Sequence, residues 1–542
     1  MAGDATLRDD RLRDASALTA GAAFGLYPAS DFRLTDGQCK DCPTIPQALW
    51  YFQREVIAVA KPGRPVASFA AGMSVADDLK RWLAQRDPDA ALEYPPLVWV
   101  AAPDVVSGAR LSADTALLDA SGRSLHASLV PKVPLNRSWF DATSAEFFHR
   151  GPIKARGWVD DGTITIRTLW PEAFRLDRAP PAIALPADEP ATLALRGLMH
   201  AEPSGGARSP YAAWTLWQRD ATQESIPSGR TVLAFMVNGA QGDDDEAHAG
   251  HFALVTGRTQ EDGAIGDWLV NNFYALDSES EKGILAAPVP LDNYLADLNS
   301  GQAWYRPSQM LVLVLANDRA AALIQGALNR VYNQFWRHQL PYRHASMNCA
   351  GISVDVLRAL GWDTPARGPA GRTAAALGFP YVAAKERSVA KARVAFDYLI
   401  EDQTRLMPAA AFEECGAAAL RLASSGKREG TLGSLAQMLA DDIDAIAFVR
   451  FPQFPSSRVF GDAPVITPWE FQARMPTDPA KAQIIPVPPR PLPHSLRAAD
   501  LAPVGRPASD YAAAVWGLLL VIGIPMFVFR HWKQWRDKRA RA

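Results

Sequence analysis

The chain has 542 residues, of which 48% are hydrophobic and 21% are charged, and its formal net charge is −2. This length allows several domains, because a single hydrophobic core stops growing at about 250–300 residues. The composition excludes a disordered chain and a polytopic membrane protein, and the balanced charge lacks the basic surface of a nucleic-acid-binding protein. We therefore expect a multidomain globular protein without a nucleic-acid partner, and the order of predicted strands and helices described below makes its fold class α+β.

Residues 1–63 are predicted to form a lead-in that contains a close cysteine pair, Cys39 and Cys42. Such a pair suits a local disulfide, half of a zinc site or a redox motif. A zinc site needs two further ligands, and no second Cys or His pair of the usual spacing follows. A redox module needs a thioredoxin-like strand and helix around the pair. We expect neither a metal nor a cofactor, and favour a structural turn.

Residues 64–200 are predicted to form a β-rich accessory module, because short apolar runs alternate with Pro, Gly and Asp-Gly turn signals. The expected strands are Leu97 to Ala102, Gly162 to Leu169 and Ala182 to Leu185. No pattern in this module indicates a particular chemistry.

Residues 208–375 are predicted to form the domain that carries the chemistry. An aromatic-rich helix is expected first, then four strands with turn residues between them, and then two helices. Asp318 can cap the first of those two helices, and Gly361 can end the second. In chain order the elements are helix Tyr211 to Arg219, strands Thr231 to Asn238, His251 to Thr256, Trp268 to Tyr274 and Met310 to Ala316, and helices Asp318 to Trp336 and Asn348 to Leu360.

Residues 376–483 are predicted to be helical, and residues 484–510 form a Pro-rich, semi-rigid linker. The expected helices of the first region are Ala-rich and run from Ala384 to Thr404, Ala409 to Ser424 and Thr431 to Ala445. No motif in this region indicates a function.

Residues 511–530 are predicted to be a single transmembrane helix, followed by a basic tail at 531–542. The stretch YAAAVWGLLLVIGIPMFVF carries no charge and is long enough to cross a bilayer core of about 30 Å. The positive tail places the C-terminus in the cytoplasm, whereas the N-terminus shows no convincing signal peptide. We expect a single-pass membrane protein, most readily of the bacterial inner membrane, with the side of the body left open.

Cys349 and His251 are the candidates for nucleophilic chemistry. Cys349 stands where a polar loop becomes a helix, and the positive end of the helix dipole there favours the reactive thiolate. His251 opens a strand, where it can serve as the base. Asn271 and Asn272 on the next strand point to opposite faces, so only one can orient the imidazole. We prefer Asn271. A buried apolar cysteine and a satisfied interior histidine are the alternative reading.

The stretches GHFALVTG and MNCAGISVDVLRALGW, with WYRPSQMLVLVL between them, are similar to the bacterial Lnb-type N-terminal periplasmic domain family. They also resemble, more distantly, the circularly permuted NlpC-like and lecithin:retinol acyltransferase-like thiol enzymes. The resemblance covers residues 230–362. It implies a permuted papain-like fold, an antiparallel sheet with a cysteine-bearing helix, and a thiol hydrolase or acyltransferase that uses Cys349 and His251.

The chain departs from that family in lacking an evident export signal and in its acidic loop QGDDDEAH just before His251. The loop is expected to be solvated rather than to bind a cation. His248 and His344 flank the motif and are expected at the surface. A peptide, lipoprotein or lipid is the expected substrate, with the bilayer as a partner of residues 511–530. The alternative is a catalytically silent papain-like scaffold that binds at the membrane.

Overall fold

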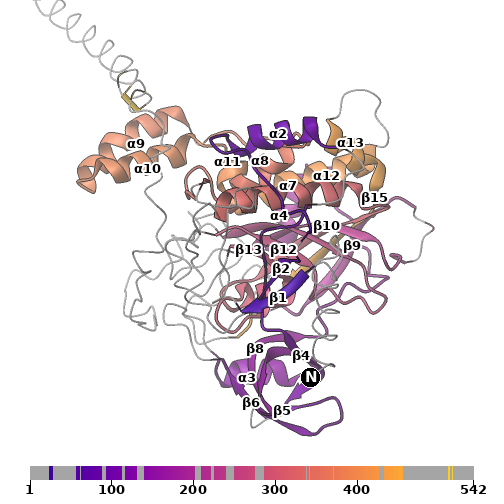
Figure 1. Ribbon diagram of the computed structural model, residues 1–542. Helices are drawn as coiled ribbons and strands as arrows, with labels where there is room; N and C mark the ends of the chain where they lie inside the picture. The colour runs from indigo at the N-terminus through magenta and orange to yellow at the C-terminus, as the bar shows by residue number, and fades with distance from the viewer. Residues whose placement is uncertain are drawn as a thin grey trace, which may run out of the picture.

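A computed structural model of the protein describes residues 24–28 and most of 56–455, together with positions 509, 511, 512 and 516. The longer gaps within the main range are 88–92, 113–115, 131–139, 202–208, 240–249, 275–285 and 426–432. The described part has the predicted α+β class, with an antiparallel sheet, a small barrel and a helical region (Figure 1).

The centre of the molecule is a seven-stranded antiparallel sheet of order β13-β12-β11-β10-β14-β15-β9. The two central strands β10 and β14 are apolar runs in which every residue is buried, so both faces of the sheet are covered here. The register aligns Asn238 at the end of β10 with His251 at the start of β11. The strands are β9 (Ala212–Gln218), β10 (Thr231–Asn238), β11 (His251–Arg258), β12 (Leu269–Asn272), β13 (Ala287–Pro290), β14 (Ser308–Leu315) and β15 (Ile443–Phe451).

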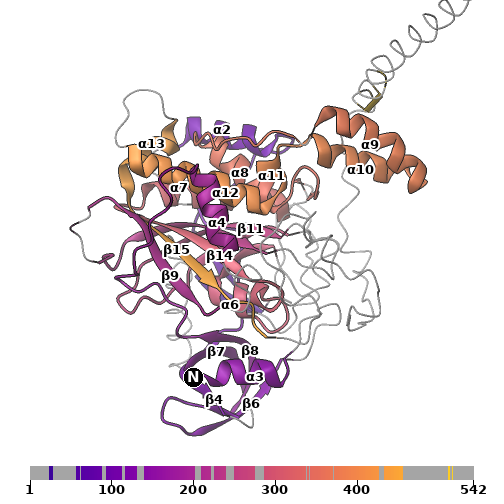
Figure 2. The same cartoon turned by 180° about the vertical axis from the view of Figure 1, so that it is seen from behind.

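One face of this sheet is covered by helices that come from distant parts of the chain (Figures 1 and 2). Helix α12 lies against β10 and β11, and α8 packs on β11 beside it. Helix α2 lies across α7 and α8, although more than two hundred residues separate them in sequence. The helices of this layer are α2 (Val75–Gln85), α4 (Ala191–His200), α7 (Arg319–Trp336), α8 (Cys349–Ala359), α11 (Gln403–Leu406), α12 (Pro408–Ser425) and α13 (Ser434–Asp442).

Two of the predicted helices are partly or wholly strands. The segment Tyr211 to Arg219 forms β9, and the end of the helix expected at Thr431 to Ala445 opens β15. These two strands pair with each other, and β15 also pairs with β14. The prediction of a helix at Tyr211 to Arg219 was wrong because the partner of this edge strand lies far along the chain, beyond any local pattern.

A small closed barrel lies at the end of the molecule away from α2 and α7 (Figures 1 and 2). One of its strands, β8, corresponds to the strand predicted at Gly162 to Leu169. Helix α3 (Ala142–His149) lies beside the barrel strands. Short α6 (Leu291–Ala296) contacts barrel strand β8 and the 3-10 helix η5 (Gln302–Trp304). The barrel strands are β4 (Asp104–Leu111), β5 (Leu117–Leu118), β6 (Ser124–Leu129), β7 (Ile153–Asp160) and β8 (Thr163–Pro171).

A separate three-stranded sheet is formed by β1 (Phe24–Pro28), β2 (Val56–Ala60) and β3 (Val98–Ala101), so the lead-in and the accessory module share a sheet. Strand β3 lies against β13 at the edge of the main sheet. The β-rich content expected of residues 64–200 is present, and it is distributed between this sheet and the barrel.

Helices α9 (Arg372–Lys385) and α10 (Val389–Ile400) form a hairpin that projects from the body (Figure 1). Tyr511 packs on this hairpin against Phe396 and Phe379, and its hydroxyl donates to Asp397 at 3.0 Å. Within the described residues no helix is both long and apolar enough to cross a membrane. Most of the predicted span at 511–530 lies outside those residues.

Candidate functional site

Cys349 is the first residue of α8, as predicted from the sequence. Asn348 is the N-cap: its side chain accepts a hydrogen bond from the backbone N–H of Gly351 at 2.9 Å. This cap satisfies one of the free N–H groups of the first turn and fixes where the helix begins. The helix packs on β11, and the cysteine is only 4% exposed. The nucleophile candidate therefore sits at a helix N-terminus that faces the strand of the candidate base.

The thiol of Cys349 is held between β11 and the loop before α8. It receives a hydrogen bond from the backbone N–H of Phe252, the residue after His251, and another links it to the Tyr342 hydroxyl. The backbone N–H of Cys349 also donates to that hydroxyl, at 3.3 Å. Burial raises the pKa of Cys349 above its ordinary value, and the hydrogen bonds from Phe252 and Tyr342 act against that rise. The resting side chain is a neutral thiol near neutral pH.

His251 begins β11 and is only 2% exposed. Gly250 before it has a φ of +85°, and a Cβ there would lie 2.4 Å from the carbonyl oxygen of Asn238, so the chain can enter the strand only with glycine. The imidazole lies between the rings of Tyr274 and Tyr294, with centroids at 6.0 and 6.2 Å. Its Nε2 atom has no hydrogen-bond partner among the described residues.

Burial, and after it the charge of Arg306, lowers the pKa of His251 to about 3. The imidazole is therefore neutral at physiological pH, which leaves Nε2 or Nδ1 able to accept a proton. Arg306 follows η5, where its guanidinium donates to the Gln302 side chain at 2.9 and 2.5 Å and to the carbonyl of Gly239 at 3.1 Å. Its charge also favours the thiolate of Cys349.

The structure thus brings Cys349 and His251 into one buried environment that Arg306 and Tyr294 share. Because Nε2 of His251 lacks a partner within the described chain, the thiol is not hydrogen-bonded to that atom in this conformation. Catalytic hydrogen bonds are often long before substrate binds and tighten in the complex.

Asn271 and Asn272 occupy different environments, as their opposite directions on β12 require. The Asn271 side chain exchanges hydrogen bonds of 3.0 Å with Gln325 on α7, and its amide also donates to the carbonyl of Leu254. A side-chain link instead joins Asn272 to His251, while Oδ1 of Asn272 has no hydrogen-bond partner within the described chain. Of the two, Asn272 is the one linked to His251, and the assignment of the third polar position stays a prediction.

Of the other sequence candidates, His344 is described and packs on Tyr342, and the rest lie outside the described residues. The His344 ring lies 5.2 Å from that of Tyr342, on the loop before Cys349. His248, the acidic loop and the Cys39–Cys42 pair are outside the described residues. Sequence reasoning missed Tyr342 and gave Arg306 no role. The only available signals were that Tyr342 stands seven residues before the cysteine and that Arg306 precedes an apolar strand.

No protein-family model, curated protein or solved structure matches this chain. The similarity to the Lnb-type family rests on its short motifs around His251 and Cys349 and remains an expectation.

Proposed function

We propose that this protein is a membrane-anchored thiol hydrolase or acyltransferase with a circularly permuted papain-like domain. Cys349 is its nucleophile, His251 its base, and Asn272 the residue that orients the imidazole. One observation carries the proposal: the thiol at the start of α8 meets the backbone N–H of Phe252, the residue that follows His251 in β11, and His251 is a buried neutral imidazole whose Nε2 is unbonded within the described chain. A neutral buried imidazole next to a helix-start thiol is the pairing that thiol acyl transfer uses.

The pKa directions bear on how the proton moves. Because burial raises the pKa of Cys349 and lowers that of His251, the neutral pair is favoured over a thiolate–imidazolium pair before substrate binds. The thiol proton therefore passes to His251 as the sulfur attacks, in a general-base step. This differs from enzymes in which the ion pair is already formed in the resting site.

In the proposed reaction, Sγ of Cys349 forms a bond to the acyl carbonyl carbon while His251 accepts the thiol proton. The carbonyl oxygen becomes an oxyanion, and the backbone N–H of Cys349, which donates to the Tyr342 hydroxyl in this structure, is the group at the helix start that can stabilise it. The bond to the leaving group then breaks, the leaving group takes the proton from His251, and a thioester remains. Water or an amine attacks the thioester carbonyl carbon and gives its proton to His251. The C–S bond then breaks, the acid or amide product leaves, and His251 returns the proton to the sulfur of Cys349.

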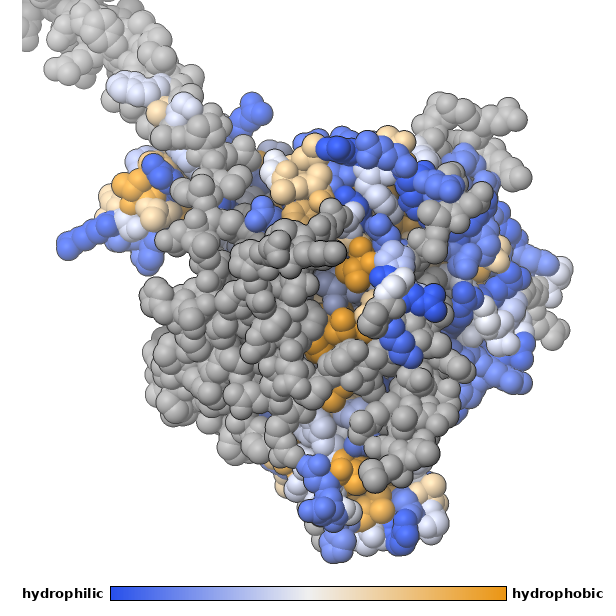
Figure 3. All heavy atoms as spheres, in the orientation of Figure 1, coloured by the Kyte–Doolittle hydropathy of each residue, from blue (hydrophilic) through white to orange (hydrophobic). Residues whose placement is uncertain are grey.

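Membrane attachment through residues 511–530 agrees with the surroundings of Tyr511. This first residue of the apolar stretch packs on α10, and Arg393 lies over its ring at 5.6 Å. The α9–α10 hairpin exposes Leu377, Val389 and Val394, and Figure 3 shows apolar atoms among charged ones on this projection. A substrate confined to the membrane or the cell envelope, such as a lipid, a lipoprotein or a peptide, suits this placement.

The test is acylation by a simple activated ester. Full-length protein in detergent is mixed with p-nitrophenyl acetate, and acetylation of each cysteine is followed by peptide mass spectrometry. Cys349→Ala and His251→Gln are expected to slow p-nitrophenol release at least 100-fold, because general-base and nucleophilic contributions are about that large or larger. The matched control is Cys415→Ala, since burial raises the pKa of that thiol to about 12.

If Cys349→Ala releases p-nitrophenol as fast as the unmodified chain, thiol catalysis at this residue is ruled out. The catalytically silent scaffold that binds a partner or a lipid then becomes the better reading, and the missing hydrogen bond between Cys349 and Nε2 of His251 is the observation that favours it.

A further inference from the structure

A short helical segment from outside the predicted thiol domain lies against the start of α8. The amide of the N-cap residue Asn348 donates to the carbonyl of Leu406 in α11 at 2.8 Å. A Cβ added at Gly351 would lie 3.2 Å from the carbonyl oxygen of Arg405, so the first turn of α8 and the backbone of α11 are already in close contact. The residues that precede Cys349 and those of α11 therefore form one packed unit.

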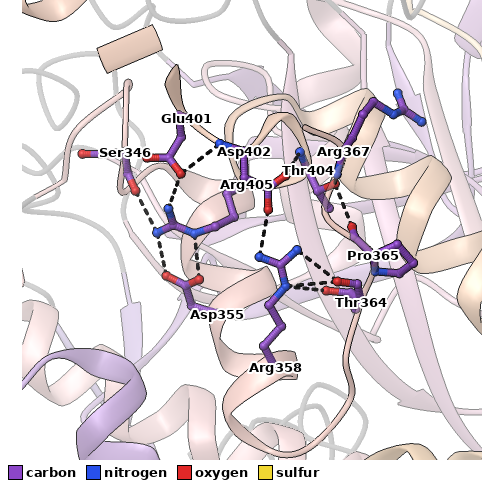
Figure 4. Close-up of polar contacts among 10 residues, drawn as sticks. All are labelled: Ser346, Asp355, Arg358, Thr364, Pro365, Arg367, Glu401, Asp402, Thr404 and Arg405. Carbon is purple, nitrogen blue, oxygen red and sulfur yellow. Dashed lines mark hydrogen bonds and ion pairs between the residues drawn. The ribbon is translucent and has the colours of Figure 1, made fainter. Parts of the chain in front are cut away.

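Arg405 is the centre of this unit (Figure 4). Its guanidinium makes two parallel hydrogen bonds of 2.8 Å to the carboxylate of Asp355, which lies further along α8. It also donates to Glu401 at 2.5 Å and to the backbone carbonyl of Ser346 at 3.1 Å. One side chain thus connects α8, the segment before α11 and the loop that leads to Cys349.

The Ser346 carbonyl is the important acceptor because of where its loop leads. The loop turns back on itself through reciprocal backbone hydrogen bonds between Arg343 and Met347. Tyr342, which bonds the thiol and backbone N–H of Cys349, stands on one side of this turn, and Asn348 stands on the other. Fixing this turn relative to α8 fixes both groups that frame the sulfur.

A planar guanidinium is required for this arrangement. It presents several N–H groups in fixed directions, whereas a lysine ammonium is a compact charge that cannot bind a carboxylate in the same two-bond geometry and reach a carbonyl beyond it. Arg405 and its two carboxylate partners are also mostly shielded from solvent, at 19%, 18% and 10% side-chain exposure.

We propose that Arg405 is a positioning residue for Cys349: it holds the turn at Ser346 against α8 and so sets the contacts of the thiol with Tyr342 and β11. The use of those contacts in acyl transfer rests on the proposed function, whereas the positioning itself does not.

Arg358 provides a matched comparison. It also ties α8 to the same segment, through Asp402 at 2.9 Å and the carbonyl of Thr364 at 3.0 and 3.1 Å (Figure 4). None of its hydrogen bonds within the described chain reaches the turn before Cys349. A variant at Arg358 therefore tests general attachment of α8 to α11, and one at Arg405 tests the turn.

The experiment measures the rate of Cys349 alkylation by iodoacetamide from pH 6 to pH 10 on the full chain, by peptide mass spectrometry. Arg405→Lys keeps the charge and is expected to move the pH profile about one unit upward, which is about tenfold less thiolate at a given pH below the midpoint. Arg358→Lys is expected to follow the unsubstituted protein. Cys415 serves as the internal reference for general opening of the fold.

The proposal is overturned if the Arg405→Lys profile coincides with that of the unsubstituted protein, or if Arg358→Lys moves it equally far. Faster alkylation of Cys415 in Arg405→Lys would overturn it too, because the helix packing as a whole would then have changed. If the profile shifts but Cys349→Ala retains full esterase activity, positioning by Arg405 stands and the proposed catalytic function fails.

Discussion

Two groups of buried ionisable side chains in this protein differ in charge: one group is neutral and the other is ionised. At the sheet, burial drives Cys349 and His251 toward their neutral forms. Between the barrel and the sheet, Lys154 and Arg156 of β7 meet Asp267 and Asp292 at 2.7 to 3.2 Å. There burial alone would raise the pKa of Asp292, but Arg156 and Lys154 hold it below its ordinary value.

The difference shows what burial does with and without a nearby counter-charge. Desolvation disfavours every charged form, and in the barrel cluster close opposite charges outweigh that effect. The barrel cluster has such partners and stays ionised, so it serves to hold β7 against α6. The thiol and imidazole are surrounded mainly by neutral hydroxyl and amide groups, with one guanidinium, and burial keeps both in their neutral forms.

The largest expected effect tests the barrel cluster. Asp292→Asn removes a fully buried carboxylate and leaves Lys154 and Arg156 with only Asp267, which is 30% exposed. We expect a loss of about 3–5 kcal/mol in the free energy of unfolding, because breaking a buried pair leaves uncompensated charge. Urea denaturation measures it.

The matched control is Asp267→Asn, at the more exposed carboxylate of the same cluster. It should lower the free energy of unfolding by clearly less than Asp292→Asn does. Equal losses for the two variants would contradict the assignment of Asp292 as the carboxylate on which the buried charges depend.

A smaller effect tests the neutral site through its pH dependence. The pKa of His251 is about 3 in the folded chain, whereas its ordinary value, which applies to the unfolded chain, is 6.5. Between pH 3 and pH 6.5 the unfolded chain therefore binds a proton at His251 that the folded chain does not. The contribution of His251 to the free energy of unfolding is therefore fully present above about pH 6.5, and it is lost as the pH falls toward 3. Between pH 7 and pH 5 the protein should lose about 2 kcal/mol more than the His251→Gln variant does.

Urea denaturation at both pH values checks this difference, and His126→Gln on exposed strand β6 is the control. The His126 variant should follow the unsubstituted protein. A His251→Gln variant with the same pH dependence as the unsubstituted chain would show that His251 is not a buried neutral imidazole.

The smallest effect concerns the asparagine that contacts His251. Asn272→Ala should slow acetylation of Cys349 about tenfold, equivalent to about 1.4 kcal/mol in activation free energy, because the imidazole loses its orienting partner. Asn271→Ala removes the hydrogen bonds to Gln325 and should lower the urea midpoint with little change in the acetylation rate. The reverse outcome would return the third position to Asn271.

The sequence predicted well those elements whose signals are local. Helix α8 has a capping Asn348 at one end and Gly361 at the other, where φ is +91°. Strands β10 and β11 are marked by continuous apolar runs, and the predicted bounds of β10 agree with the structure. The α+β class follows from these elements together.

Features that depend on distant partners could not be predicted. Segment Ala212–Gln218 is a strand because it pairs with β15, which lies far along the chain. The alternation of side chains on β12 predicts that Asn271 and Asn272 point to opposite faces, but it does not predict which of them lies near His251. Arg405 lies more than fifty residues after Cys349 in a segment with no motif, so only the packing of α11 on α8 shows its connection to the site.

Gly250 has a consequence for any mutational scan of this protein. A side chain at this position would press on the backbone of Asn238, whose own side chain accepts from Tyr294 and donates to Ser308 at 2.7 Å. Tyr294 in turn faces His251. A saturation library at position 250 should therefore recover glycine alone. The position would rank beside Cys349 in sensitivity although it has no chemical group to contribute, because it sets the path by which the chain reaches the histidine.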